Sequence, residues 1–280
     1  MPKRIILLFI LAGILVGCGG DPIQRQLLKS TSKIEKAYIP ALLYTETFKQ
    51  RQAQFAMERL KDEWGSFYAR YYNLELKYGV DITDKFWKSD LDAIGSAISS
   101  AEAFIQANLM PAAFMRLSIV RGAMRDIRRR HGIESVLDRL TDFDESLQKI
   151  YGFVRARRNI SDRDATILKK MLDDTQAKWE LVERSKISSS LYGFSSSKTQ
   201  ALKKRLRDEG ERVKNLAALA YIRDPGSILS SVTDLRNNFT LLYKAFGDFD
   251  PIIKRLEEQS RKIKTQKTST TTTTLARRRR

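Results

Sequence analysis

Apolar side chains recur along most of the chain at alternating steps of three and four residues. Four such stripes stand out in the first half, within residues 53–78, 87–105, 114–131 and 133–154. This spacing keeps the apolar residues on one face of an α-helix, where they can pack against neighbouring helices. No comparable stretch alternates with period two, which is the pattern of a half-buried β-strand. We therefore predict an all-α fold.

The second half of the chain repeats several tryptophan, glycine and Tyr-Gly positions of the first half. At a shift of 115 positions Trp64 falls on Trp179 and Gly132 falls on Gly247, and two Tyr-Gly turns match at a shift of 114. A fixed period of this kind indicates a duplicated unit. We predict two tandem up-down four-helix bundles that are related by an internal repeat of about 115 residues.

The helical stripes set the expected domain limits. Bundle one should span residues 39–158 and bundle two residues 159–267. In front of them, residues 18–38 are predicted to form a tether or a polar helical arm. Residues 268–280 combine a threonine run with four terminal arginines and have almost nothing apolar to bury, so we predict a disordered basic tail.

The N-terminal segment has the features of an export signal. Lys3 and Arg4 precede an apolar run at 5–16, which is too short to span a bilayer but fits the hydrophobic part of a signal peptide. We therefore predict that residues 1–17 are a signal peptide that is removed on export. The Leu-Val-Gly-Cys sequence at 15–18 resembles the lipobox of bacterial lipoproteins.

This resemblance implies that Cys18 is lipidated and becomes the mature N-terminus. A diacylglycerol on its thiol and an N-linked acyl chain such as palmitate would provide enough acyl surface for stable membrane anchoring. Gly19 follows the cysteine, where the family uses aspartate for retention in the inner membrane. We therefore expect a bacterial cell envelope location, on the periplasmic or outer face of the outer membrane. The alternative is a plain signal peptide with an incidental cysteine.

The composition limits the chemistry that the chain can support. Its 280 residues include one cysteine and one histidine, which excludes a disulfide framework, a zinc cluster and c-type haem attachment. The sequence also has no Gly-x-Ser-x-Gly elbow and no phosphate-binding glycine loop. We therefore predict a non-enzymatic binding or scaffolding protein without a cofactor.

The chain carries a net charge of +18, and part of this excess lies on one predicted helix, the third stripe, which holds six arginines and one acid. Arg121, Arg125 and Arg128 share a face and, with Arg129, form the predicted binding site for an anionic partner. For an exported, anchored protein that partner would be anionic lipid or an acidic envelope protein, and nucleic acid is not expected. The alternative is a solvated charged face. A second basic stretch, 198–214, holds seven basic and three acidic residues.

His131 is the only imidazole in the chain and stands directly before Gly132. We predict that it ends its helix, because a histidine suits the negative end of a helix and glycine supplies the left-handed turn. His131 and Glu134 also resemble the His-x-x-Glu motif of imelysin-like periplasmic iron proteins, and the overall plan is similar to cytochrome-type bundles. The alternative function is therefore a periplasmic metal- or haem-binding bundle, or a cofactor-free relative of one, with iron at His131 and Glu134. A haem would use His131 with a methionine such as Met57 or Met124.

Two positions in the second half carry polar residues where the repeat predicts apolar ones. Thr175 corresponds to Leu60, and Glu209 corresponds to Ile94. Because an unpaired buried carboxylate is costly, we expect Glu209 to lie at the margin of its stripe and to reach solvent. The alternative is a buried carboxylate that marks a small cavity.

The serine-rich segment 185–197 is the longest predicted loop, and it contains Leu191, Tyr192 and Phe194. We expect these side chains to pack onto the end of the bundle. The alternative is an exposed contact site for another molecule.

Overall fold

The computed structural model describes residues 22–74, 84–219 and 221–262. Within these ranges the chain folds into helices and contains no β-strand, so the predicted all-α class is confirmed. None of the helices in these ranges is both long and apolar enough to cross a membrane. The predicted signal peptide, the lipobox cysteine and the predicted tail at 268–280 lie outside the described residues.

Four helices of the first half pack together and are called group one here. They are α2 (Pro22–Glu46), α3 (Gln50–Tyr71), α5 (Trp87–Gln106) and α6 (Met110–Arg130). Helix α2 contacts α3 and α6, and α5 contacts the same two helices, so the four helices form a closed ring. Each apolar stripe faces the centre of this ring. The described positions of the three stripes in group one are buried, apart from Phe114 and His131, which are half-buried.

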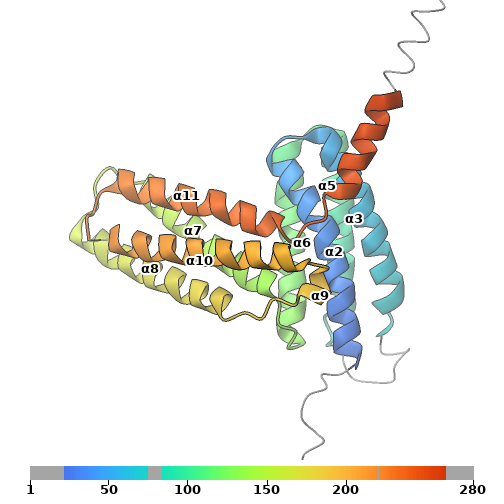
Figure 1. Ribbon diagram of the computed structural model, residues 1–280, viewed down its shortest axis with the longest axis horizontal. Helices are drawn as coiled ribbons and strands as arrows, with labels where there is room; N and C mark the ends of the chain where they lie inside the picture. The colour runs from blue at the N-terminus through green and yellow to red at the C-terminus, as the bar shows by residue number, and fades with distance from the viewer. Residues whose placement is uncertain (1–21, 75–83, 220, 263–280) are drawn as a thin grey trace, which may run out of the picture.

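Four later helices form a second ring, called group two. They are α7 (Val136–Arg155), α8 (Asp162–Glu183), α10 (Ser196–Leu219) and α11 (Pro225–Lys244). Helix α7 contacts α8 and α11, and α10 contacts the same two helices. The short helix α9 (Ser189–Tyr192) lies between α8 and α10 in sequence and touches α2. Figure 1 shows group two lying crosswise to group one.

After α11 the chain returns to group one. Residues 250–262 are helical, and Figure 1 shows this segment beside the helices of group one. Arg255 in this segment pairs with Glu58 of α3 and lies over the ring of Phe55. The last described helical turns therefore cover the outer side of α3.

The turn between α11 and this final segment packs tightly on α2. The backbone N–H of Asp248 donates a hydrogen bond to the carbonyl oxygen of Lys36 over 3.0 Å. A Cβ atom on Gly247 would lie only 2.9 Å from Cγ2 of Ile39, so this close approach requires glycine. Helix α2 and the turn after α11 are thus in direct contact.

The packing places two segments differently from the predicted bundle limits. The range 39–158 assigns α7 to bundle one, but α7 contacts α8 and α11 of group two. The predicted tether 18–38 belongs, from Pro22 on, to α2, and its side chains Leu27 and Ile34 are buried. Both errors have one cause. Polar residues separate the apolar positions of α2, so its sequence pattern indicates an arm and not a bundle helix. If the first bundle is counted from α3, its fourth helix becomes α7, and both bundle limits move by one helix.

A tryptophan packs against a glycine in each group. Nε1 of Trp64 on α3 lies 3.2 Å from the position that a Cβ atom of Gly95 on α5 would occupy, and Nε1 of Trp179 on α8 lies 2.8 Å from the corresponding position of Gly210 on α10. Both pairs join the second helix of a group to its third long helix. In each case the glycine gives the indole ring the space it needs.

Glu209 is buried, contrary to the expectation that it reaches solvent. It is 1% exposed, and its Oε1 atom has no hydrogen-bond partner among the described residues. Burial raises the pKa of Glu209 to about 8, although Arg212 acts in the opposite direction. Thr175 is also buried and donates to the carbonyl oxygen of Met171 over 2.8 Å. The stripe shows which residues share a face but not how far a neighbouring helix covers its margin.

We predict that Glu209→Gln removes a loss of stability at rising pH. Glu209 ionises near pH 4.5 in the unfolded chain and near pH 8 in the folded chain, so the folded state binds the extra proton between these values. Its contribution to the free energy of unfolding therefore falls as pH rises through this interval, by about 1.4 kcal/mol per pH unit at most. Chemical denaturation at several pH values should show the variant gaining stability over the natural chain from pH 4.5 to 8.

Glu211→Gln is the matched control, because Glu211 is exposed and pairs with Lys214 on the same helix. This control should differ little from the natural chain at any pH. A stability difference between Glu209→Gln and the natural chain that does not change with pH would contradict the buried placement of Glu209.

Candidate functional site

The four predicted arginines lie where α6 of group one faces α7 of group two. Arg128 is buried, and its guanidinium lies 2.9 Å from Oε1 of Glu35 on α2. The same guanidinium donates to the carboxylate of Asp138 on α7, with one donor–acceptor distance of 2.8 Å. One cation therefore neutralises a carboxylate from each group.

The other three arginines also face acids of α7. Arg125 donates to Asp142 over 3.0 Å and to Glu145 over 2.8 Å, Arg121 lies 3.7 Å from Asp144, and Arg129 pairs with Asp142. Three of the acids on α7, Asp138, Asp142 and Glu145, are spaced by four and three residues, like Arg121, Arg125 and Arg128 on α6. We call this set the arginine clamp: Glu35, Arg121, Arg125, Arg128, Arg129, Asp138, Asp142, Asp144 and Glu145.

The prediction that these arginines form an exposed face for an anionic partner is wrong. The side chains of Arg121 and Arg125 are 15% exposed, that of Arg128 is 5% exposed, and only Arg129 is half exposed, at 53%. All four are paired within the chain. The sequence shows that the cations share one face of a helix, but it does not show which helix supplies the opposing charges.

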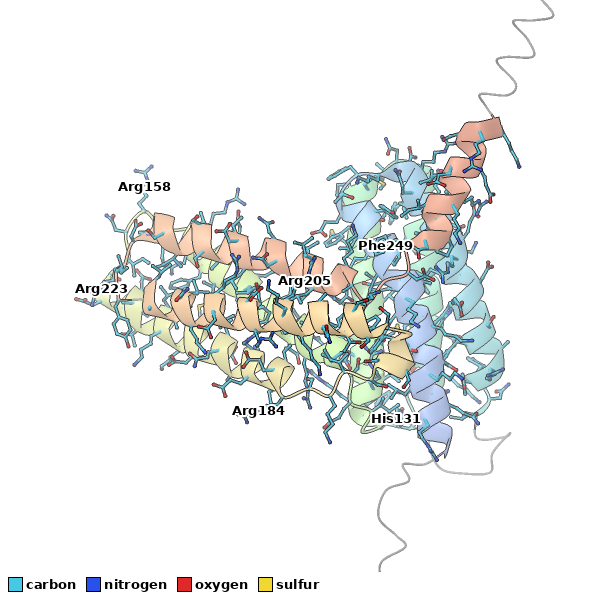
Figure 2. The ribbon with its side chains drawn as sticks, in the orientation of Figure 1. His131, Arg158, Arg184, Arg205, Arg223 and Phe249 are labelled. Atoms are coloured by element: carbon cyan, nitrogen blue, oxygen red, sulfur yellow. The ribbon has the colours of Figure 1, made fainter. Side chains whose placement is uncertain are left out.

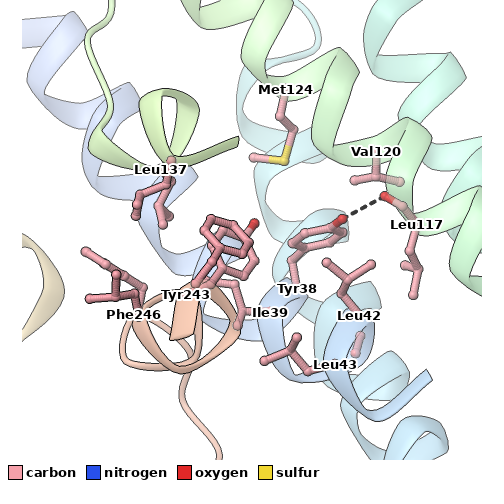
Figure 3. Close-up of a cluster of buried hydrophobic side chains, with 14 of the residues drawn as sticks. Tyr38, Ile39, Leu42, Leu43, Leu117, Val120, Met124, Leu137, Tyr243 and Phe246 are labelled. Carbon is pink, nitrogen blue, oxygen red and sulfur yellow. Dashed lines mark hydrogen bonds between the residues drawn. The ribbon is translucent and has the colours of Figure 1, made fainter. Parts of the chain in front are cut away.

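An apolar seam also joins the two groups. Figure 3 shows Tyr38 of α2, Leu117 of α6, Leu137 of α7 and Tyr243 of α11 in this seam. The hydroxyl of Tyr38 donates to the carbonyl oxygen of Leu117 over 2.8 Å. Burial at this junction raises the pKa of Glu35 to about 7, while the positive charge of Arg128 acts to lower it. The buried part of the clamp, Glu35, Arg128 and Asp138, thus lies in surroundings where an unpaired charge would be costly.

His131 ends α6, as predicted. It is the C-cap residue, and Gly132 after it has a φ of 63°, in the left-handed region. The ring of His131 meets Trp87 edge to face, with centroids 5.4 Å apart. Glu134 is 83% exposed and pairs with Arg139 over 3.1 Å. The two candidate iron ligands therefore contact different side chains.

The other residues named for a cofactor lie in the core. Met57 is 1% exposed and Met124 is 6% exposed, and both belong to the main hydrophobic cluster. Over the part of the chain that the structure describes, no three His, Cys, Asp or Glu side chains come together in a way that could hold a metal ion.

The structure contains a cavity that the sequence pattern does not indicate. It has a volume of about 710 Å³ and lies at the junction of the groups, between α2, α9, α10 and the end of α11. We call it the junction cavity. Its cationic lining residues are Lys36, Lys198, Arg205 and Lys244, and its acidic ones are Asp248 and Asp250. Figure 2 shows Arg205 on α10 and Phe249 in the turn after α11.

Aromatic rings form one wall of the junction cavity. Gly193 has a φ of 66°, and this turn places Tyr192 and Phe194 side by side with their centroids 5.4 Å apart. Both rings are buried and contact Phe246, so the expectation that the aromatic residues of the serine-rich loop pack onto the bundle is confirmed. The ammonium group of Lys198 lies 4.5 Å from the centroid of Phe194.

The cations of the junction cavity differ from those of the clamp in their pairing. Within the described ranges, none of Lys36, Lys198, Arg205 and Lys244 forms a salt bridge, whereas Asp248 pairs with Arg59 over 2.6 Å. Partial burial lowers the pKa of Lys36, and the neighbouring cation Lys198 lowers it further, although Asp248 acts to raise it. An anion in the cavity would relieve this repulsion and could accept charge-assisted hydrogen bonds.

The basic stretch at 198–214 is the sequence signal for this site. Of its seven basic residues, Lys198 and Arg205 line the cavity. The remaining cations come from α2 and α11, which are far from this stretch in sequence. The sequence therefore indicates the charge of one wall but not the cavity.

No protein family, curated protein or solved structure matches this chain.

We predict that Arg128→Met destabilises the chain by about 3–5 kcal/mol, because it leaves Glu35 and Asp138 buried without their cation. Arg116→Met on the same helix is the control, since Arg116 is exposed and forms no salt bridge with a described residue. The free energy of unfolding from urea denaturation measures both effects.

Neutralising the two carboxylates should restore part of the loss. Adding Glu35→Gln and Asp138→Asn to Arg128→Met removes the uncompensated negative charges, so the triple variant should be more stable than Arg128→Met alone. Equal destabilisation by Arg128→Met and Arg116→Met would show that the clamp does not hold the groups together.

Proposed function

We propose that this chain is a membrane-anchored lipoprotein of the bacterial cell envelope that acts as a non-enzymatic binding or scaffolding module. Its anion-binding site is the junction cavity, in place of the helix face at Arg121 to Arg129. The lipobox at 15–18 and the preceding signal peptide support the anchor at Cys18. Gly19 supports the outer membrane as its location.

The observation that carries the binding proposal is the contrast between two sets of cations. The arginines of the clamp face carboxylates, whereas Lys36, Lys198, Arg205 and Lys244 line a cavity without salt-bridge partners among the described residues. Cations gathered around a cavity repel one another, so they favour a negatively charged occupant. This cavity also has the volume of a small-molecule site.

The wall of Tyr192 and Phe194 suggests the chemistry of the ligand. These rings offer apolar surface next to the charged groups of Lys198 and Arg205. A ligand that combines a phosphate or carboxylate with an apolar portion would satisfy both parts of the cavity. Anionic lipids and lipid-like molecules of the envelope have this composition.

The two helix groups are a duplicated four-helix bundle in this proposal. The shift of 115 residues takes the start of α6 at Met110 to the start of α11 at Pro225. It also relates the Trp64–Gly95 pair to the Trp179–Gly210 pair. Two contacts that use the same residue types, at the same spacing and between equivalent helices, support a common origin. The junction cavity then lies where one copy meets the other.

We predict that Lys198→Glu combined with Arg205→Glu weakens binding of dodecyl phosphate by at least about tenfold, because two cations of the cavity become repulsive. Titration calorimetry below the micelle concentration measures the affinity. Lys203→Glu with Arg207→Glu is the matched control, since both residues are exposed on the same helix and neither lines the cavity. Equal affinities of the two double variants would refute the assignment of the cavity as the binding site.

We predict that the chain incorporates labelled palmitate when it is expressed in a bacterial host, and that Cys18→Ser abolishes the label. Cys18 is the only cysteine, so no other thiol can carry the diacylglycerol. Mass spectrometry of the mature chain provides a second measurement, since signal removal and acylation change the mass together. An unlabelled natural chain would remove the anchor from the proposal.

A further inference from the structure

The first turns of α2 lie at one end of group one, together with an end of each of the other three helices. The hydroxyl of Tyr71, the last residue of α3, lies 3.0 Å from the hydroxyl oxygen of Ser30 in α2. Trp87, the first residue of α5, donates from its indole N–H to the carbonyl oxygen of Tyr71 over 2.9 Å. His131 after α6 packs against Trp87. The start of α2, the end of α3, the start of α5 and the end of α6 therefore share one end, which we call the anchor end.

The anchor end lies close to the proposed lipid. Only three residues separate Cys18 from Pro22, where α2 begins. Even a fully extended chain of this length spans about 14 Å. Because α2 is an integral part of group one, the folded unit follows the lipid almost directly and no long tether separates them. This step rests on the proposed function, specifically on lipidation at Cys18.

An exposed aromatic ring with cationic neighbours lies at this end. Phe86, directly before α5, is 48% exposed, and the ammonium group of Lys85 lies 5.0 Å from its ring centroid. The guanidinium of Arg130 lies 5.8 Å from the same centroid. Aromatic side chains beside lysine and arginine are typical of protein surfaces that rest at the level of lipid headgroups.

The charge of the anchor end suits an anionic surface. Lys29, Lys85 and Lys88 are exposed and form no salt bridge with another described residue. Among the described acids at this end, Asp84 and Asp90 both pair with Arg130, and Asp92 accepts hydrogen bonds from Tyr68 and Tyr72. The pairing leaves the lysines available to contact phosphate groups, which attract basic residues within a short distance of a bilayer.

We infer that the anchor end of group one rests on the anionic phospholipid bilayer that holds the lipidated Cys18, with Phe86 at the level of the headgroups. The short connection to Cys18, the exposed ring and the lysines all point to the same occupant. In this orientation α2 rises from the membrane, and group two lies crosswise to α2, as Figure 1 shows.

The loop at the far end of group two provides a matched reference point. Tyr221 and Ile222 are more exposed than Phe86, at 80% and 64%, and they are flanked by Arg223. The exposure of apolar side chains alone therefore does not distinguish the two places, although Arg223 pairs with Asp162. Their positions relative to the start of α2 do, and Figure 2 shows Arg223 at the end of group two that points away from group one.

The test measures tryptophan quenching by lipid. The lipidated chain, as Phe86→Trp or Tyr221→Trp, is placed in vesicles of phosphatidylcholine and phosphatidylglycerol that carry bromine on the first carbons of the acyl chains. The natural tryptophans Trp64, Trp87 and Trp179 are all buried, so the natural chain provides the baseline. We expect quenching of Phe86→Trp to exceed that of Tyr221→Trp by on the order of twofold or more above this baseline. Lys85→Trp, at the adjacent exposed position, is a second reporter if Phe86→Trp fails to fold.

The outcomes separate the orientation from the anchor. Equal quenching of the two variants, or stronger quenching of Tyr221→Trp, overturns the orientation while the lipoprotein assignment stands. A purified chain that lacks the mass of the acyl groups and does not float with uncharged vesicles overturns the anchor, and the orientation with it.

Discussion

The structure depends on the burial of one positive charge between two helix groups. Arg128 of α6 lies between Glu35 of α2 and Asp138 of α7, in an environment from which water is largely excluded. Removing one partner from such a set leaves an uncompensated charge, which costs more than the pair contributes. The other arginines of the clamp extend the same pairing along α6. Together these contacts fix how group two crosses group one, because a rotation would separate the arginines of α6 from the acids of α7.

The junction cavity lies where group two crosses group one. Glu35 belongs to the clamp, and the next residue, Lys36, lines the cavity together with Lys198 and Arg205 of group two. Neighbouring residues of α2 thus have opposite roles: one holds the groups together, and the other contributes to a site for an outside molecule. Cationic side chains are structural where they form salt bridges with acids, and they are available for binding where they form none with a described residue. Net charge alone does not distinguish these two cases.

The parts of the fold that local patterns determine could be predicted from the sequence. Stripes such as the one from Trp87 to Ile105 are buried as expected, and the cap at His131 and Gly132 follows from the preference of glycine for the left-handed region. Features that depend on which helices meet could not be predicted. The acids opposite Arg121 and Arg125 come from α7, and the cover over Glu209 comes from neighbouring helices. The junction cavity belongs to the same class, since its walls come from segments far apart in the chain.

The contact between α2 and the turn after α11 has a consequence for biogenesis. Lys36 and Asp248 bond through their backbones, and Gly247 fits against Ile39, so the packing of the first described helix is completed only by the turn that follows α11. Contacts at such large sequence separation close late and slow folding. If the chain is exported from its N-terminus, α2 reaches the far compartment well before its final partner. The part of α2 around Ile39 then stays uncovered until this turn arrives, although α3 and α6 can already pack on the rest of the helix.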